Sequence, residues 1–311
     1  MSVKPISYLV FLLTLVAGCS SPEPETSSKD EPQAVAVADD DLNGRLAPPT
    51  PVTDREPNTD GKVFIVMYHR IVDEEASDYD RSKENFRKDL ETLYEAGFRP
   101  VTLGEYVDNT MDIPPGATPV VMTFDDSDPS QIRFLEDGTL DPESGVGIWT
   151  QFAEEHPDFP VKGSFFVLRS RTFTGDGRAE VNHLLDIGCE VESHTLSHQN
   201  LAKMTDEEVM AELGGAQEFL RSLGVNRPRF LCLPFGVRPK NLDLLKSFDW
   251  NGETVTHDAA LMVGSGPAPS PGDPERDAHK LARINAYDGD YGLAYWLKKV
   301  ESGEVRLYVE P

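Results

Sequence analysis

Two pairs of polar residues in this sequence have the types and spacing of a metal-dependent hydrolytic site. Asp125 and Asp126 are adjacent carboxylates that directly follow an apolar run. Neighbouring residues on a strand point to opposite sides, so one carboxylate could bind a metal ion while the other takes a proton from water. An isolated Asp-Asp pair is more often a helix cap or a turn. The pair therefore needs support from elsewhere in the chain.

The second pair consists of His194 and His198, which lie four residues apart in the sequence HTLSH. In a turn or in the first turn of a helix, residues at this spacing face the same way, so two imidazoles could bind one divalent ion. Imidazole combined with carboxylate suits zinc or a neighbouring first-row metal. The chain has only 7 His, and both pairs follow an apolar run. Their combination indicates a site more strongly than either pair does alone.

The elements that must position these residues begin with short apolar runs that are rich in β-branched residues. Such runs predict buried strands. They cover residues 62–68, 119–124, 164–168, 189–193 and 229–233, with weaker candidates at 259–263 and 305–309. Both polar pairs come directly after one of these strands, at its carboxyl end.

Apolar residues at helical spacing predict helices between the strands, over residues 82–96, 179–186 and 206–224. Ser82 is a plausible N-cap, and Thr205 with Glu208 forms a capping box. Residues 127–160 are longer than an ordinary connection, and their Gly- and Asp-rich part is expected to be a surface insertion. Alternating strands and helices favour an α/β fold with a mostly parallel sheet, open or closed as a barrel. In such folds, sites form at the carboxyl ends of the strands.

The composition excludes several classes of protein. The chain has 311 residues with a formal net charge of -25, and no basic stripe offsets the acidic excess. Nucleic acid is therefore excluded as a partner, and a neutral or cationic substrate fits the charge better. The 3 Cys do not form a disulfide framework or a CxxC zinc site. No protein partner is predicted.

The N-terminus has the features of an export signal. Residues 1–18 contain an early Lys and an apolar run that is short for a transmembrane span. The run ends in LVAGC, which resembles the lipobox of bacterial lipoproteins and implies lipid on Cys19. Plain secretion and an uncleaved anchor are the alternatives. Residues 19–60 are rich in Pro, Ser and acidic residues and predict a disordered tether. We therefore expect a lipid-anchored protein of the cell envelope that faces the periplasm or the exterior.

Several motifs resemble those of one enzyme family. The sequence TFDD (123–126) and the sequence SHTLSH (193–198) are similar to the first two motifs of the NodB-type polysaccharide deacetylases, carbohydrate esterase family 4. Further stretches follow in the family's order: VFIVMYHRI (63–71), GSFFVL (163–168) and LPFG (233–236). The opening stretch looks closest to the branch that contains the poly-N-acetylglucosamine deacetylases. The resemblance covers roughly residues 61–285, so the deacetylase domain is expected over residues 61–311.

The resemblance implies a distorted (β/α) barrel of about seven strands. It also implies that Asp126, His194 and His198 bind one divalent metal ion, zinc, with cobalt or nickel as alternatives. Asp125 would be the general base that takes the proton of a water molecule activated by the metal. That water would attack the acetyl carbonyl of a polysaccharide substrate, and the products would be acetate and an amine or a hydroxyl.

The sequence departs from the family pattern at the supports of the catalytic residues. Ser127 stands where the family usually has Gly. Cys232 stands where the family usually places an Arg that orients the catalytic Asp. Arg229 and Arg238 are the nearby candidates to replace that Arg.

The family's C-terminal Leu-x-x-His motif, which supplies the general acid, is also missing. The sequence LARINA (281–286) occupies about that region and contains no His. His257 and His279 lie near it in sequence, but neither matches the motif. The donor of the proton to the leaving group is therefore open at this point.

Two further residues are candidates for contacts with substrate. His69 ends the first strand and could line the same cleft, or it could be a hydrogen-bonded His with a structural role. Phe235 could contribute to a sugar platform together with Trp250, but a core position is expected for both. Cys189 is expected to be buried and inert.

The leading hypothesis is an enzyme that removes N-acetyl groups from an envelope or extracellular polysaccharide containing N-acetylglucosamine. A glycan-binding lipoprotein with the same fold and reduced or lost turnover is the first alternative, because of Cys232 and the missing His. An O-acetyl polysaccharide esterase is the second alternative. No G-x-S-x-G motif is present, which argues against a serine esterase.

Overall fold

The computed structural model describes residues 55–264 and 266–311. The expected signal peptide, Cys19 and most of the expected tether therefore lie outside the described residues. Arg55 Nη2 donates a hydrogen bond of 2.6 Å to the hydroxyl of Thr118, and Asn58 pairs with Val309. Residues 55–60 thus contact the domain, which begins before the predicted boundary at residue 61. Within the described ranges, no helix has the length and apolar character needed to span a membrane.

The centre of the domain is a parallel sheet whose strands run in the order β11, β8, β7, β6, β5, β1, β12. An eighth strand, β4 (Phe98–Pro100), pairs with the first half of β5. The bounds of the seven strands, in chain order, are β1 (Phe64–Tyr68), β5 (Thr118–Phe124), β6 (Gly163–Val167), β7 (Glu190–Ser193), β8 (Phe230–Cys232), β11 (Ala259–Leu261) and β12 (Ile284–Asn285).

The segment that contains β12 connects the two edges of this sheet. Ile284 pairs with Val66 of β1, while Leu281 forms a parallel bridge with Leu261 of β11. Residues 281–285 therefore reach from one edge strand to the other. The distorted (β/α) barrel of about seven strands that was expected from the sequence is confirmed.

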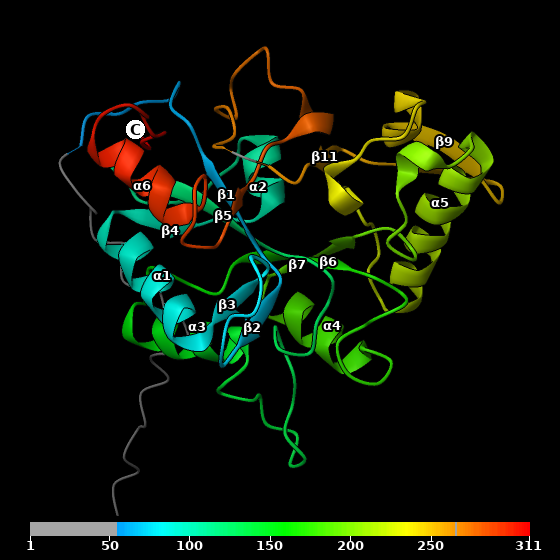
Figure 1. Cartoon of the computed structure of the whole chain (residues 1–311), viewed down its shortest axis with the longest axis horizontal. Coiled ribbons are helices and arrows are strands. Elements are labelled where there is room, and N and C mark those ends of the chain that lie inside the picture. Colours follow the sequence, from blue (N-terminus) through cyan, green and yellow to red (C-terminus); the bar gives the residue numbers. More distant parts are fainter. Residues whose placement is uncertain (1–54, 265) are drawn as a thin grey trace, which may run out of the picture. The chain divides into compact units, whose positions relative to one another are not determined.

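Six helices surround the strands in the described part of the chain. They are α1 (Lys83–Glu95), α2 (Leu103–Asp108), α3 (Gly145–Glu155), α4 (Arg178–Asp186), α5 (Asp206–Ser222) and α6 (Leu293–Glu301). Helices α1 and α6 lie at one side of the sheet and α5 at the other (Figure 1). The predicted caps form: Ser82 accepts from Asn85 N, and Thr205 and Glu208 make the capping box of α5.

Alternating strand residues divide the core into layers. Phe64 and Val66 of β1 pack with Phe86 and Leu90 of α1, whereas Ile65 belongs to a second cluster on the other face. This alternation is what a strand with period two produces when both of its faces are buried. The second cluster includes Leu103 and Tyr106 of α2. This helix lies at the amino end of β7, where the backbone N–H of Gly104 donates to Glu190 at 3.0 Å.

Smaller elements complete the domain. Two-stranded pairs are formed by β2 (Arg70–Val72) with β3 (Asp80–Ser82) and by β9 (Ser247–Trp250) with β10 (Glu253–Thr256). Short 3₁₀ turns cover Leu201–Lys203, Pro234–Gly236, Leu242–Leu245 and Ala278–Lys280.

The connection over residues 127–160 includes α3, which places Val146 and Trp149 in the core. One sequence prediction needs correction. The weak strand predicted at 305–309 does not form. Leu307 and Val309 make isolated bridges to Lys62 and Asn58 instead.

Candidate metal and catalytic site

The carboxyl ends of β1, β5, β7 and β8 meet around one cavity of about 310 Å³. Six of the residues singled out from the sequence line it: His69, Asp125, Asp126, His194, His198 and Phe235. The remaining lining residues are Arg70, Ser77, Tyr79, Arg171 and Val263. The structure thus brings both polar pairs together with His69 and Phe235, as parallel strand topology predicts.

Asp126, His194 and His198 converge on one point of this cavity. Asp126 Oδ1 lies 3.3 Å from His194 Nε2 and 3.6 Å from His198 Nε2, and the three ligand atoms lie within 4.8 Å of one another. Asp126 Oδ1 is buried and has no hydrogen-bond partner, which is the state of an oxygen shaped to receive a cation. Two imidazoles and one carboxylate with an open fourth position form the ligand set of catalytic zinc sites. The residues therefore fit a divalent metal ion.

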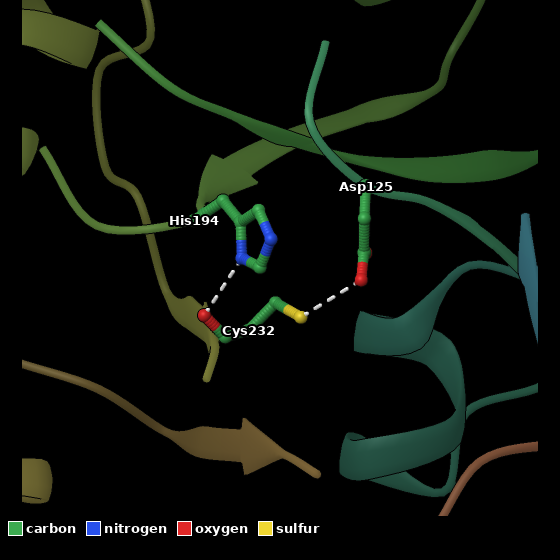
Figure 2. A group of neighbouring side chains, drawn as sticks. All are labelled: Asp125, His194 and Cys232. Atoms are coloured by element: carbon green, nitrogen blue, oxygen red, sulfur yellow. Dashed lines mark hydrogen bonds between the residues drawn. The ribbon is translucent and has the colours of Figure 1, made fainter. Parts of the chain in front are cut away.

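A backbone contact fixes the orientation of His194. Its Nδ1 lies 3.0 Å from the carbonyl oxygen of Cys232, as Figure 2 shows. A carbonyl oxygen only accepts hydrogen bonds, so Nδ1 carries the proton and Nε2 presents its lone pair toward Asp126. Histidine ligands of metal ions are commonly held by such a second hydrogen bond.

The turns that carry the metal-site residues use left-handed backbone conformations. Asp126 has φ 72°, Thr195 has φ 67° and His198 has φ 58°. Residues other than Gly seldom adopt this region, and such positions cluster at functional sites where the surrounding structure enforces them. The Thr195 hydroxyl accepts from the His198 N–H at 3.1 Å and holds this turn. The ring centroids of His194 and His198 are consequently 4.8 Å apart.

Ser127 follows the two aspartates, at the position where the family usually has Gly, and its side chain is held by two hydrogen bonds. It also has a positive φ, of 45°. Its buried hydroxyl accepts from Leu168 N at 3.1 Å and donates to the carbonyl oxygen of Arg171. The hydroxyl thereby ties the end of β5 to the loop after β6, and these hydrogen bonds offset the cost of the strained backbone.

Asp125 points to a different partner, the guanidinium of Arg283. Nη1 and Nη2 of Arg283 lie 2.8 Å and 2.7 Å from Oδ1 and Oδ2 of Asp125. Burial alone raises the pKa of the Asp125 carboxyl, but the charge and hydrogen bonds of Arg283 outweigh it and hold that pKa below its usual range. Arg283 is itself anchored by the carbonyl oxygen of Met262 and the hydroxyl of Thr123. Asp125 is therefore a fixed, ionised carboxylate.

Cys232 touches both members of this ion pair. Its Sγ lies 3.2 Å from Asp125 Oδ2 (Figure 2) and 3.0 Å from Arg283 Nη2. Burial raises the pKa of the Cys232 thiol, so the thiol keeps its proton and donates to the carboxylate. The position at which the family carries its Arg is thus occupied by a small hydrogen-bond donor.

The arginine that supports Asp125 is neither of the two suggested by the sequence. Arg229 lies before β8, at the opposite end of that strand from the site, and pairs with Asp258 at 2.6 Å and Asp108 at 2.7 Å. It does not line the cavity, so the expectation that it contacts substrate or supports Asp125 is wrong. The guanidinium on Asp125 belongs to Arg283, not to Arg229 or Arg238.

A second group of ligand atoms, from Asp125, His194 and Cys232, also lies within 4.8 Å. Both carboxylate oxygens of Asp125 are bound by Arg283, and His194 Nδ1 is bound by a backbone carbonyl. A metal ion in that position would have to displace these hydrogen bonds. Asp126, His194 and His198 are therefore the better ligand set.

His69 lies on the other side of Asp125, with Nε2 3.8 Å from Asp125 Oδ2. Burial lowers the pKa of His69 to about 4, although the neighbouring carboxylates oppose this shift. Its Nδ1 is buried without a hydrogen-bond partner, and its ring packs against Tyr79 at 4.7 Å. The imidazole of His69 is therefore neutral at neutral pH and lies beside the Asp125 carboxylate.

The other two histidines considered from the sequence are not at the site. His257 precedes β11, so it lies at the end of that strand opposite the cavity. His279 Nε2 lies 2.8 Å from the carbonyl oxygen of His257. Neither residue lines the cavity, so neither replaces the missing general acid.

Phe235 corrects the expectation of a core position. Its backbone φ of 59° turns the ring outward, leaving the residue 60 % exposed with its ring 4.7 Å from that of His198. It forms part of the rim of the cavity. Trp250, in contrast, packs against the cluster beneath α5 and does not line the cavity.

Two supporting residues were missed by sequence reasoning. Arg283 lies in the LARINA stretch, and its only signal was an Arg in the region where a family motif was missing. Gln131 donates to the carbonyl oxygens of His69 and Asp125 and so connects the ends of β1 and β5. Nothing in the local sequence marks Gln131 as a link between strands.

Comparisons with known proteins agree with this site. The family model described as polysaccharide deacetylase matches residues 112–250, a range that contains both aspartates and both histidines. The comparison with curated proteins gives no match. Over this range the chain therefore matches the model of the family that its motifs resemble, the polysaccharide deacetylases, whose members are hydrolases.

Solved structures share the fold at low sequence identity. A polysaccharide deacetylase from Bacillus cereus is 18% identical, with a TM-score of 0.58 over 78% of this chain and 69% of that one. The Streptococcus pyogenes deacetylase PplD, solved in complex with acetate, is 15% identical, with a TM-score of 0.55 over 81% of this chain and 100% of that one. IcaB from Ammonifex degensii is 18% identical, with a TM-score of 0.50 over 73% of this chain and 92% of that one.

Proposed function

We propose that this protein is a metal-dependent hydrolase that removes N-acetyl groups from a polysaccharide containing N-acetylglucosamine. One observation carries the proposal. A ligand set for a divalent ion (Asp126, His194 and His198) and an ionised carboxylate fixed by Arg283 line the same cavity. A metal site and an adjacent base are the two parts that hydrolysis of an amide requires.

The residues divide the chemistry between them. A divalent ion at the ligand set supplies Lewis acidity toward the acetyl carbonyl and makes water more acidic. Asp125 is the acceptor for the proton of the attacking water, because its low pKa keeps it ionised. The bidentate contact with Arg283 holds both carboxylate oxygens in one orientation. Asp125 therefore acts as a positioned base that does not need to reorganise.

His69 is the group best placed to return a proton to the leaving nitrogen. Its Nε2 lies 3.8 Å from Asp125 Oδ2, and it lines the same cavity as the proposed metal ligands. This position supports His69 in the place of the family's missing C-terminal His.

The substrate class follows from the surface and the relatives. The formal net charge of -25 favours a neutral or cationic glycan. The related streptococcal deacetylase was solved with acetate, which is the product expected here. The exposed ring of Phe235 at the rim is suited to pack against a sugar.

One of the two arguments for a glycan-binding protein without turnover no longer holds. It was motivated by Cys232 and by the missing C-terminal His. Because Arg283 supplies the ion pair that Cys232 cannot make, the base retains its support. O-deacetylation of an acetylated polysaccharide uses the same site and is distinguished by substrate.

The location proposed for the protein rests on residues 1–60 alone. A lipobox-like sequence at Cys19 followed by an acidic, Pro-rich segment supports lipid anchoring of the domain at the cell envelope, facing the periplasm or the exterior. Mass spectrometry of the protein purified from membranes tests this proposal. Cleavage before Cys19 with added acyl chains is the expected result, and a water-soluble product cleaved near residue 17 would contradict it.

The function is tested by acetate release from N-acetylglucosamine oligomers, poly-N-acetylglucosamine and peptidoglycan, with a panel of O-acetyl esters in parallel. The chain is assayed after metal removal and after addition of zinc, cobalt or nickel. We expect release from an N-acetylated substrate that depends on added metal. Protein that binds zinc but releases no acetate from any amide or ester would contradict the proposal, and release from esters alone would assign O-deacetylation.

A further inference from the structure

A second cavity of about 230 Å³ adjoins the first. The two cavities share Tyr79 and Val263 in their linings. The wall of the second cavity is formed by residues 78–79, residues 263–264 and the segment that follows β12. We call this second cavity the tyrosine groove, because Tyr79, Tyr287 and Tyr291 line it.

The rings of Tyr79 and Tyr291 in the groove are exposed to solvent, and that of Tyr291 is held in place by neighbouring aromatic residues. Tyr79 is 48% exposed and Tyr291 is 55% exposed. Tyr291 packs against Tyr295 at 5.1 Å, and its carbonyl oxygen accepts from the indole N–H of Trp296 at 3.1 Å. Exposed aromatic rings that are held in place by their neighbours are typical of surfaces that bind a ligand with apolar faces and polar edges.

The charge of the groove differs from that of the first cavity. Asp78 and Asp290 line it, and among the described residues no lysine or arginine forms an ion pair with either. The first cavity, in contrast, is lined by Arg70 and Arg171 together with Asp125 and Asp126, so its charges are mixed. Burial, and then the charges of Asp78 and Asp290, raise the pKa of Tyr287, so both carboxylates lie near the same hydroxyl. The groove therefore favours a cation.

A hydrogen bond holds the two walls of the groove together. Asn285 Nδ2 donates to the carbonyl oxygen of Asp78 at 2.7 Å, which ties the loop between β2 and β3 to the end of β12. The groove is thus a fixed feature of the folded domain. Tyr79, which lines it, packs directly against the ring of His69.

We propose that the tyrosine groove binds a sugar unit that carries a free amine, next to the unit whose acetamide reacts in the first cavity. This proposal rests on the proposed function. The tyrosine rings would pack against the apolar face of the sugar, and an ammonium group gains from both the ring faces and the two carboxylates. A neutral N-acetylated unit lacks this charge attraction to the carboxylates.

This assignment has a consequence for the reaction. The amine left by one round of deacetylation becomes the group that the groove recognises in the next round. The enzyme therefore removes acetyl groups preferentially beside units that are already deacetylated, and the products are clustered along the chain.

Binding is measured first, because a fully deacetylated oligomer is not turned over. The probe is a β-linked glucosamine tetramer, titrated by calorimetry into the intact zinc-loaded protein. We expect D78N/D290N to weaken binding about tenfold, since two exposed charge pairs contribute about 1.4 kcal/mol together. Binding by the unsubstituted protein should also weaken as salt is raised.

A matched control separates the groove from the acidic surface as a whole. Asp176 and Asp243 are 78% and 84% exposed and lie outside both cavities, so D176N/D243N makes the same change in net charge. Equal affinity of the tetramer for D78N/D290N and the unsubstituted protein would overturn the proposal, as would equal weakening in both double variants.

The activity assay compares kcat/KM for two oligomers that differ only in the neighbour of the reacting unit, which is either glucosamine or N-acetylglucosamine. We expect a preference of about tenfold for the glucosamine neighbour, which D78N/D290N removes while leaving kcat/KM on the fully acetylated oligomer unchanged. Equal kcat/KM values in the unsubstituted protein would overturn the groove assignment. Failure of the proposed function looks different, because no acetate is then released from any oligomer.

Discussion

Asp125 and Asp126 are neighbours in sequence, yet the structure places them in opposite environments. The side chain of Asp125 is 1% exposed and bound by Arg283, whereas that of Asp126 is 26% exposed and faces His194 and His198. The left-handed φ of 72° at Asp126 separates the two directions. Two identical carboxylates thus acquire different environments through their partners, and in the proposed function one is the base and the other a metal ligand.

The two halves of the site also differ in how they are built. The metal side consists of Asp126 at the end of β5, His194 at the end of β7 and His198 in the turn that follows. The base side joins the ends of β5 and β8 to Arg283, which is 158 residues from Asp125 in the chain. Each residue of the metal side therefore has a local sequence signal at its own strand end, whereas the base side is assembled by the closure of the barrel. This difference can be tested by making the same chemical change on each side.

The largest effect is expected for Asp125→Asn. An amide cannot accept the proton of water, so kcat should fall by about 10³-fold. The metal ligands are untouched, so the zinc affinity measured by competition with a chromogenic chelator should stay within about threefold of the unsubstituted value. Retained turnover in D125N, at a correct zinc content, would remove Asp125 from the base role.

Asp126→Asn is the matched change on the metal side. Here the zinc affinity itself should fall, by about 100-fold, because an amide oxygen is a weaker ligand than a carboxylate. Activity should be low at limiting zinc and recover in part as zinc is raised, which D125N does not do. A D126N protein with normal zinc affinity would show that the ion is held elsewhere, for example by the group around Cys232.

The contrast between local and assembled parts explains which features could be predicted from the sequence. Asp126, His194 and His198 carry their signal in their own neighbourhood, because each follows an apolar strand and the two His are four residues apart. The main strands and the caps at Ser82 and Thr205 were equally local and form as predicted.

Arg283 could not be predicted in the same way. It stands directly before β12, a strand of two residues, Ile284–Asn285, which is too short to show any periodicity. Its meeting with Asp125 depends on residues 281–285 bridging β11 and β1, a long-range event. The expectation for Phe235 was wrong for another reason: large aromatic side chains are usually buried, but a left-handed turn exposes this one.

Arg283→Lys tests the assembled half with a smaller expected effect. Lysine keeps the charge but cannot make the bidentate contact, so kcat/KM should fall about tenfold. Weaker pairing lets the pKa of Asp125 rise, so the acid limb of the pH–rate profile should move to higher pH. Arg99→Lys is the control, because Arg99 is buried and paired with Asp158 at 2.6 Å near the opposite end of the sheet. A profile shifted equally by R99K would mean that lost stability, rather than Asp125, is the cause.

Arg283→Lys should also change how the free energy of unfolding depends on pH. The folded-state pKa of Asp125 is depressed, so its contribution is fully present above its unfolded pKa of about 3.9 and is lost as the pH falls toward the folded value. In R283K the folded pKa is higher, so this contribution should be smaller. Denaturant unfolding at pH 7 and pH 3 measures it: the difference in unfolding free energy should be smaller in R283K than in the unsubstituted protein.

The smallest effect is expected at Cys232, the residue that replaces the family's Arg. Its thiol donates one neutral hydrogen bond to Asp125, and such a bond contributes about 1 kcal/mol. Cys232→Ala should therefore lower kcat by about fivefold, while Cys232→Ser, which keeps a donor, should restore most of it. Cys189 provides the matched control, because it is also buried and its Sγ lies 3.7 Å from the carbonyl oxygen of Val161, away from the site. If C189A and C232A lower kcat equally, the contact with Asp125 has no catalytic value, and Arg283 alone positions the base.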